Sequence, residues 1–123
     1  MSRTAIALRV LIGLHLVWTF LLTPAALEPR PFSTISLIGW VSLVLIFATV
    51  GLDIAAFLIV GRNVRRAALL AAIGPFLLVG PVIGDQLGLF ASLPAPAQIV
   101  ALEFAALLTQ VAILVVAIRL RRQ

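Results

Sequence analysis

The sequence has no cysteine, no lysine and no tyrosine, and it contains a single histidine among 123 residues. Without cysteine the chain can form neither a disulfide nor a thiolate metal site. The sequence also contains no nucleophile motif, no cofactor fingerprint and no group of residues with the spacing of metal ligands. We therefore expect a protein that is not an enzyme and that has no metal and no cofactor.

Charged side chains are scarce as well. They make up 11% of the residues, against about 25% in an average soluble domain. Apolar residues make up 63%, and the mean hydropathy is +1.27. Apolar runs of about 18 or more residues are typical of helices that cross a bilayer, so the sequence predicts an integral membrane protein surrounded by lipid. Segments without Asp, Glu or Arg cover residues 10–27, 31–52, 67–84, 86–102 and 104–118.

We predict an all-α integral membrane fold, an antiparallel bundle of four transmembrane helices that forms one domain over residues 1–123. Connectors that contain proline or arginine separate the helices, because proline ends one helix and favours the start of the next. The first helix has the pattern of a signal peptide, but a proline beside the candidate cleavage site favours a retained helix. The expected spans cover residues 5–23, 35–60, 66–90 and 97–118.

All nine basic residues are arginine, and their distribution predicts an orientation. Cytoplasmic loops of membrane proteins carry an excess of basic residues, and eight arginines against one fall on the side of the termini. Only Arg30, beside Glu28, falls on the other side. We therefore expect both termini in the cytoplasm. The eight are Arg3, Arg9, Arg62, Arg65, Arg66, Arg119, Arg121 and Arg122.

The same arginines bear on localisation and partners. A pI near 11.9 would suit a nucleic-acid-binding protein. These residues, however, stand in short clusters beside apolar runs, where they anchor helices at a membrane surface, so we expect no nucleic-acid binding. The bias toward arginine, alanine, leucine and valine is typical of GC-rich bacterial genomes. We therefore expect a multi-pass protein of the bacterial inner membrane.

The third span contains the unusual stretch GPFLLVGPVIGDQLG, with two Gly-Pro steps six residues apart. Each proline frees one backbone carbonyl, which must find a partner in hydrocarbon. We favour a kinked helix with glycines at the sites of close packing over a broken helix that lines a transport path. Asp85 lies about 28 Å beyond Arg66, so we expect it to end the span in contact with water. The kink and packing residues are Gly74, Pro75, Gly80, Pro81, Gly84 and Gly88.

Three polar residues are predicted to meet in the cytoplasmic half of the membrane. At about 1.5 Å per residue from the nearest arginine, His15 lies about 9 Å deep, and Asp53 and Gln110 lie about 13 Å deep. A pair between His15 and Asp53 is the most specific contact expected. His15 also begins a stripe with Thr19 and Thr23 on one helix face. The layer is either a hydrogen-bonded cluster that fixes helix register, which we favour, or a proton relay or headgroup site.

Glu103 lies higher, about 24 Å from the inner anchors, and is expected in the outer half or at an interface with a partner. The small loops and the scarcity of reactive groups favour a non-catalytic accessory or assembly subunit, with other membrane subunits or copies of the chain as partners. The alternative is a parallel homo-oligomeric, proton-coupled transporter or channel that uses His15 and Asp53. A third hypothesis is a protein that binds a lipid or a quinone.

Overall fold

The computed structural model describes residues 1–23 and 28–122. Within these residues the chain is helical and has no β-strand, so the predicted all-α fold is confirmed. Each of the four α-helices is long and apolar enough to cross a membrane, which supports a multi-pass membrane protein. The elements are α1 (Arg3–Leu21), the 3-10 helix η1 (Phe32–Thr34), α2 (Leu37–Ile59), α3 (Val64–Gln86) and α4 (Ala97–Arg122).

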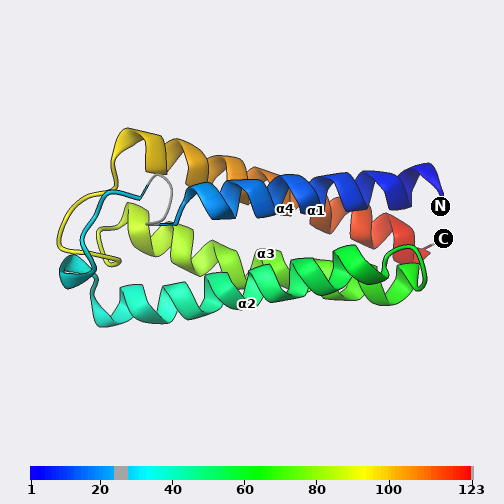
Figure 1. Cartoon of the computed structure of the whole chain (residues 1–123), viewed down its shortest axis with the longest axis horizontal. Coiled ribbons are helices and arrows are strands. Elements are labelled where there is room, and N and C mark those ends of the chain that lie inside the picture. The colour runs from blue at the N-terminus through cyan, green and yellow to red at the C-terminus, as the bar shows by residue number, and fades with distance from the viewer. Residues whose placement is uncertain (24–27, 123) are drawn as a thin grey trace.

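The helices lie side by side along the long axis of the molecule (Figure 1). Both termini lie at one end, together with the short turn between α2 and α3; we call this the terminal end. The connections from α1 to α2 and from α3 to α4 lie at the opposite end, which we call the loop end. Helix α3 lies between α2 and α4, and α1 contacts α4 more extensively than it contacts α2. The side of the bundle between α1 and α2 is therefore the most loosely packed.

Polar caps decide where the helices begin. The Ser2 side chain accepts a hydrogen bond from the Ala5 backbone N–H, and Asn63 does the same for Arg66. These caps start α1 and α3 two residues earlier than predicted, at residues 3 and 64 instead of 5 and 66. Helix α4 continues to residue 122 instead of 118, because its apolar pattern runs into the terminal arginines.

The end of α3 also differs from the prediction. The helix stops at Gln86 instead of residue 90, because Gly88 adopts φ +76° and closes a Schellman motif. In this motif the N–H of Gly88 donates to the Asp85 carbonyl at 3.0 Å, and the N–H of Leu89 donates to the Gly84 carbonyl at 2.9 Å. The prediction of Gly88 as a packing residue inside the span is therefore wrong: it is the residue that ends the helix.

The Gly-Pro stretch forms one continuous helix. α3 runs through Pro75 and Pro81 without interruption, so the alternative of a broken helix is wrong. Gly74 packs closely, since a Cβ there would lie 2.9 Å from the Gln110 side-chain oxygen. A Cβ at Gly80 or Gly84 would meet nothing within 4 Å, so the prediction of close packing at these two glycines does not hold within the chain.

The two ends of the bundle are closed in different ways. At the terminal end, small side chains let the helices approach, as at Ala56, Ala67 and Ala71, all fully buried beside Leu8 and Ile12. The terminal end of the bundle is therefore held together by a closely packed core of small and apolar side chains.

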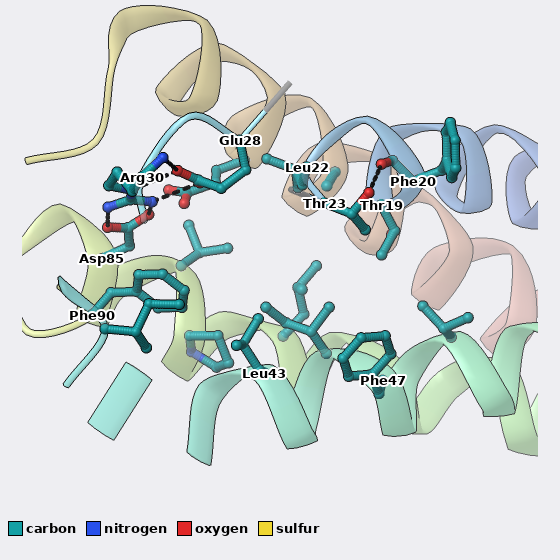
Figure 2. A pocket seen from close by; sticks show the side chains of 18 of the residues that line it. Thr19, Phe20, Leu22, Thr23, Glu28, Arg30, Leu43, Phe47, Asp85 and Phe90 are labelled. Atoms are coloured by element: carbon teal, nitrogen blue, oxygen red, sulfur yellow. Dashed lines mark hydrogen bonds and ion pairs between the residues drawn. The ribbon is translucent and has the colours of Figure 1, made fainter. Parts of the chain in front are cut away.

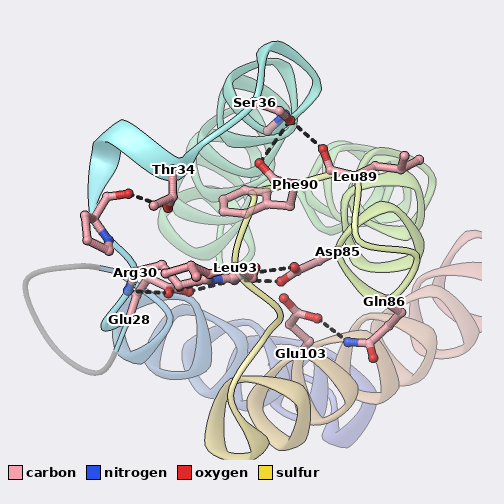
Figure 3. Close-up of polar contacts among 12 residues, drawn as sticks. Glu28, Arg30, Thr34, Ser36, Asp85, Gln86, Leu89, Phe90, Leu93 and Glu103 are labelled. Carbon is pink, nitrogen blue, oxygen red and sulfur yellow. Dashed lines mark hydrogen bonds and ion pairs between the residues drawn. The ribbon is translucent and has the colours of Figure 1, made fainter.

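At the loop end, the two connections bind each other. The N–H of Ser36 donates to the Phe90 carbonyl at 2.9 Å, and the N–H of Ser92 donates to the Thr34 carbonyl at 2.8 Å. The Ser36 hydroxyl also bonds the Leu89 and Phe90 carbonyls (Figure 3). A Cβ at Gly39 would lie 2.1 Å from the Phe90 carbonyl oxygen, so only glycine permits this approach. The contacts hold residues 28–36 over the end of α3.

Candidate functional site: an apolar cavity with an ionic end

The structure brings together the three polar residues predicted to share one layer. His15 from α1, Asp53 from α2 and Gln110 from α4 are all 0% exposed. His15 Nδ1 bonds Asp53 Oδ2, which is the predicted contact. The Gln110 side-chain nitrogen lies 3.0 Å from His15 Nδ1 and 3.1 Å from His15 Nε2. If His15 Nδ1–H donates to Asp53, Nε2 is free to accept from Gln110, and the three side chains form one hydrogen-bonded chain.

This buried cluster is incompletely satisfied. Asp53 Oδ1 and Gln110 Oε1 have no hydrogen-bond partner among the residues that the structure describes. Buried polar atoms without a partner are rare and costly, and a carboxylate oxygen is an especially costly example. The cluster can therefore take up a proton or a further hydrogen-bond donor without breaking an existing contact.

A second polar cluster lies at the loop end and is centred on Arg30 (Figure 3). Its guanidinium donates to Asp85 through Nη1 and Nη2, at 2.7 and 2.8 Å, and to Glu28 through Nε and Nη2, at 2.8 and 2.9 Å. Hydrogen bonding to Asp85 raises the pKa of Arg30, burial opposes the shift and Glu28 adds to it, so the guanidinium stays charged.

The prediction that Asp85 is exposed to water is wrong. Its exposed fraction is 5%, because the connection from α1 to α2 places Arg30 directly over the end of α3. Glu103, which was predicted in the outer half or at an interface with a partner, is 7% exposed within the chain and accepts a hydrogen bond of 2.7 Å from Gln86. Both carboxyls therefore lie inside the bundle, toward the loop end.

Between these two clusters lies a cavity of about 520 Å³ (Figure 2). It occupies the loop half of the bundle between α1 and α2, where the helices pack most loosely. Its walls are mostly apolar, while its ionic end contains Glu28, Arg30, Asp85 and Glu103. The apolar walls include Leu16, Leu43, Phe47, Val50, Leu78 and Val82.

The cavity connects the bundle surface with the neighbourhood of the buried histidine. Phe20 and Phe47 line it and are 60% and 64% exposed, so it opens sideways between α1 and α2. Its inner lining includes Leu16, the residue next to His15, and Thr19, whose hydroxyl donates to the His15 carbonyl at 2.9 Å. The cavity therefore runs from the ionic end toward the buried polar layer. Its lining does not include the alanines of the core at the terminal end.

Sequence reasoning missed the cavity and the part that Glu28 and Arg30 play in it. The spacing of His15, Thr19 and Thr23 was the one signal, since Thr19 of α1 and Thr23 just beyond its end both line the cavity. Comparison with models of known protein families, with characterised proteins and with solved structures finds no match to this chain. Its function must therefore be argued from its own geometry.

Proposed function

We propose that the chain is a non-catalytic, multi-pass membrane protein that binds one small amphiphilic molecule in the cavity between α1 and α2. The observation that carries the proposal is a 520 Å³ cavity with mostly apolar walls and a charged end. Its volume falls within the range of about 300–1,000 Å³ that is typical of small-molecule sites. Apolar walls suit a hydrocarbon tail, and the four ionisable groups suit a polar head.

The orientation of the bundle supports entry from the membrane. Eight arginines lie toward the terminal end, whereas Arg30 at the loop end is held in an ion pair. By the positive-inside rule, the helices cross the bilayer in an antiparallel bundle with both termini in the cytoplasm of a bacterial cell. The cavity then lies in the outer half of the inner membrane, where its side opening faces lipid. An amphiphile dissolved in the outer leaflet reaches it without crossing water.

Filling the cavity is expected to abolish binding. We predict that Leu43→Trp lowers the affinity for tritiated dodecanol at least about tenfold, because the indole takes up space that the tail needs. Binding is measured as the displaceable signal of the protein in phosphatidylcholine nanodiscs. The matched control is Val44→Trp, since Val44 is the next residue on α2, is 67% exposed and does not line the cavity. Equal binding by both variants and the unaltered protein would contradict the proposal.

A second candidate function is proton-coupled transport through the buried layer. It is favoured by one oxygen each of Asp53 and Gln110 that has no hydrogen-bond partner within residues 1–23 and 28–122, and by a cavity that approaches His15 from one side. We predict that Asp53→Asn, which removes the titrating carboxyl, abolishes proton flux into proteoliposomes under a pH gradient. Flux at the original rate in this variant would exclude Asp53 from the path.

Binding an amphiphile is compatible with the accessory role predicted from the sequence. A subunit that holds a small membrane molecule can present it to a neighbouring protein, and the exposed apolar faces of the helices can meet either lipid or a partner. Other membrane subunits, or further copies of the chain, stay predictions. Gentle purification from the native membrane and measurement of the mass of the complex distinguish these arrangements.

A further inference from the structure

The ionic end of the cavity has an excess of acidic groups. Glu28, Asp85 and Glu103 line it together with a single basic residue, Arg30. The other arginines belong to the parts of α1, α3 and α4 at the terminal end of the bundle and to the turn between α2 and α3. The formal charge at the ionic end is therefore negative whether or not Glu103 holds a proton.

Arg30 has no donor left for an anionic ligand. A guanidinium has five N–H groups, and here each has an acceptor. Nε donates to Glu28, Nη2 donates to Glu28 and Asp85, and Nη1 donates to Asp85 and, at 3.5 Å, to the Leu93 carbonyl. The Phe90 ring covers the guanidinium with its centroid 4.8 Å away. A phosphate or carboxylate head would have to break these bonds, and it would meet the surrounding carboxyls.

The remaining lining suits a cation. Phe32, Trp40 and Phe90 contribute to the cavity wall from segments at the loop end, and the rings of Phe32 and Trp40 are stacked with centroids 6.0 Å apart. Aromatic faces attract ammonium groups, and Trp attracts them most strongly. Glu103 accepts a hydrogen bond from Gln86 and also contacts Asp85, and no basic side chain forms an ion pair with it in the described residues.

We infer that the cavity selects amphiphiles with a cationic head, a primary or quaternary ammonium, over those with a neutral or anionic head. The ammonium lies at the ionic end, between Glu103 and the aromatic side chains, and the hydrocarbon tail extends along α1 and α2 toward Leu16. This inference rests on the proposed binding function and adds the class of ligand. Arg30 bonds two of the three carboxyls at this end, Glu28 and Asp85, and does not bond the third, Glu103.

The test compares ligands that share one tail. Dodecyltrimethylammonium, dodecylamine, dodecanol and dodecanoate compete with tritiated dodecanol on the protein in phosphatidylcholine nanodiscs. Concentrations are corrected for partition into nanodiscs without protein. We expect the two cations to bind about tenfold more tightly than dodecanol, because the carboxyls and the aromatic rings at the ionic end attract a positive charge, and we expect dodecanoate to bind most weakly. The comparison uses the unaltered protein and does not depend on any variant.

A variant of Glu103 tests whether this residue is responsible for the preference for cations. Glu103→Gln is expected to lower the affinity for the two cations severalfold more than the affinity for dodecanol. Arg121→Gln, at the terminal end, removes one charge of the opposite sign far from the cavity and is expected to alter neither affinity. Equal affinity for all four ligands, or tightest binding of dodecanoate, would overturn the inference and leave the proposed function standing. The absence of displaceable dodecanol binding would overturn both.

Discussion

Arg30→Leu is expected to lower the free energy of unfolding by about 3–5 kcal/mol, since removal of one member of a buried ion pair leaves the other charges uncompensated. Asp85 and Glu28 each share two bonds with this guanidinium, and in its absence two carboxyls face each other inside the bundle. The measurement is thermal unfolding of the purified protein in detergent, followed by circular dichroism. The side chain of Arg30 is only 3% exposed, so solvent compensates little for the loss.

Two further variants make this result specific to the ion cluster. Arg121→Leu removes an exposed arginine and is expected to change the stability by no more than about 0.5 kcal/mol. Arg30→Lys keeps the charge but not the paired N–H groups that bond both carboxylates. Its loss of stability is therefore expected to fall between the losses of Arg30→Leu and Arg121→Leu. In the proposed orientation, removal of the only outer arginine strengthens the positive-inside bias, so the variants keep their topology. Equal stability of Arg30→Leu and Arg121→Leu would mean that the buried ion pair does not hold the loop end together.

The fold could be predicted because hydropathy and helix geometry are local properties. Apolar runs set the number of helices, and polar caps such as Ser2 and Asn63 shifted the boundaries by two residues. The contact between His15 and Asp53 was also predictable. A helix advances by a fixed rise per residue, so distance along the sequence from the arginines gives depth in the membrane. Residues at equal depth on polar faces then meet when the bundle forms.

The cavity could not be predicted by the same reasoning. Its volume depends on how far α1 stands from α2, and no periodicity in the sequence encodes that separation. The mistake about Asp85 has a related cause. Depth placed Asp85 near the end of α3, where the structure has it, but whether this residue meets water depends on the path of the connector that carries Arg30. Gly80 and Gly84 failed for a similar reason. Four-residue spacing predicts that the glycines share one helix face, but it does not predict whether another helix packs against that face.

The second large effect is expected at the buried histidine. Asp53→Ala is predicted to lower the free energy of unfolding by about 3–5 kcal/mol, because it leaves the His15 ring buried without its acceptor and removes one of the two partners of the Gln110 amide. The matched control is Thr49→Ala, one turn earlier on α2 and also fully buried. Its hydroxyl bonds only the Leu45 carbonyl of its own helix, at 3.0 Å, so its loss is expected to be smaller.

A double-mutant cycle separates the pair from its surroundings. The combined variant of His15→Ala and Asp53→Ala is expected to be more stable than the sum of the two single losses predicts, by about 0.5–3 kcal/mol, since each single change strands the other partner. Additive losses would mean that the two side chains do not act as a pair. Asp53→Asn separates a structural role from proton transfer. The Asn amide oxygen can still accept a hydrogen bond from His15, but the side chain can no longer take up and release a proton. If Asn preserves stability and proton flux alike, the pair fixes helix register. If it preserves stability and abolishes flux, the same hydrogen bond that holds α1 against α2 is the one that carries the proton.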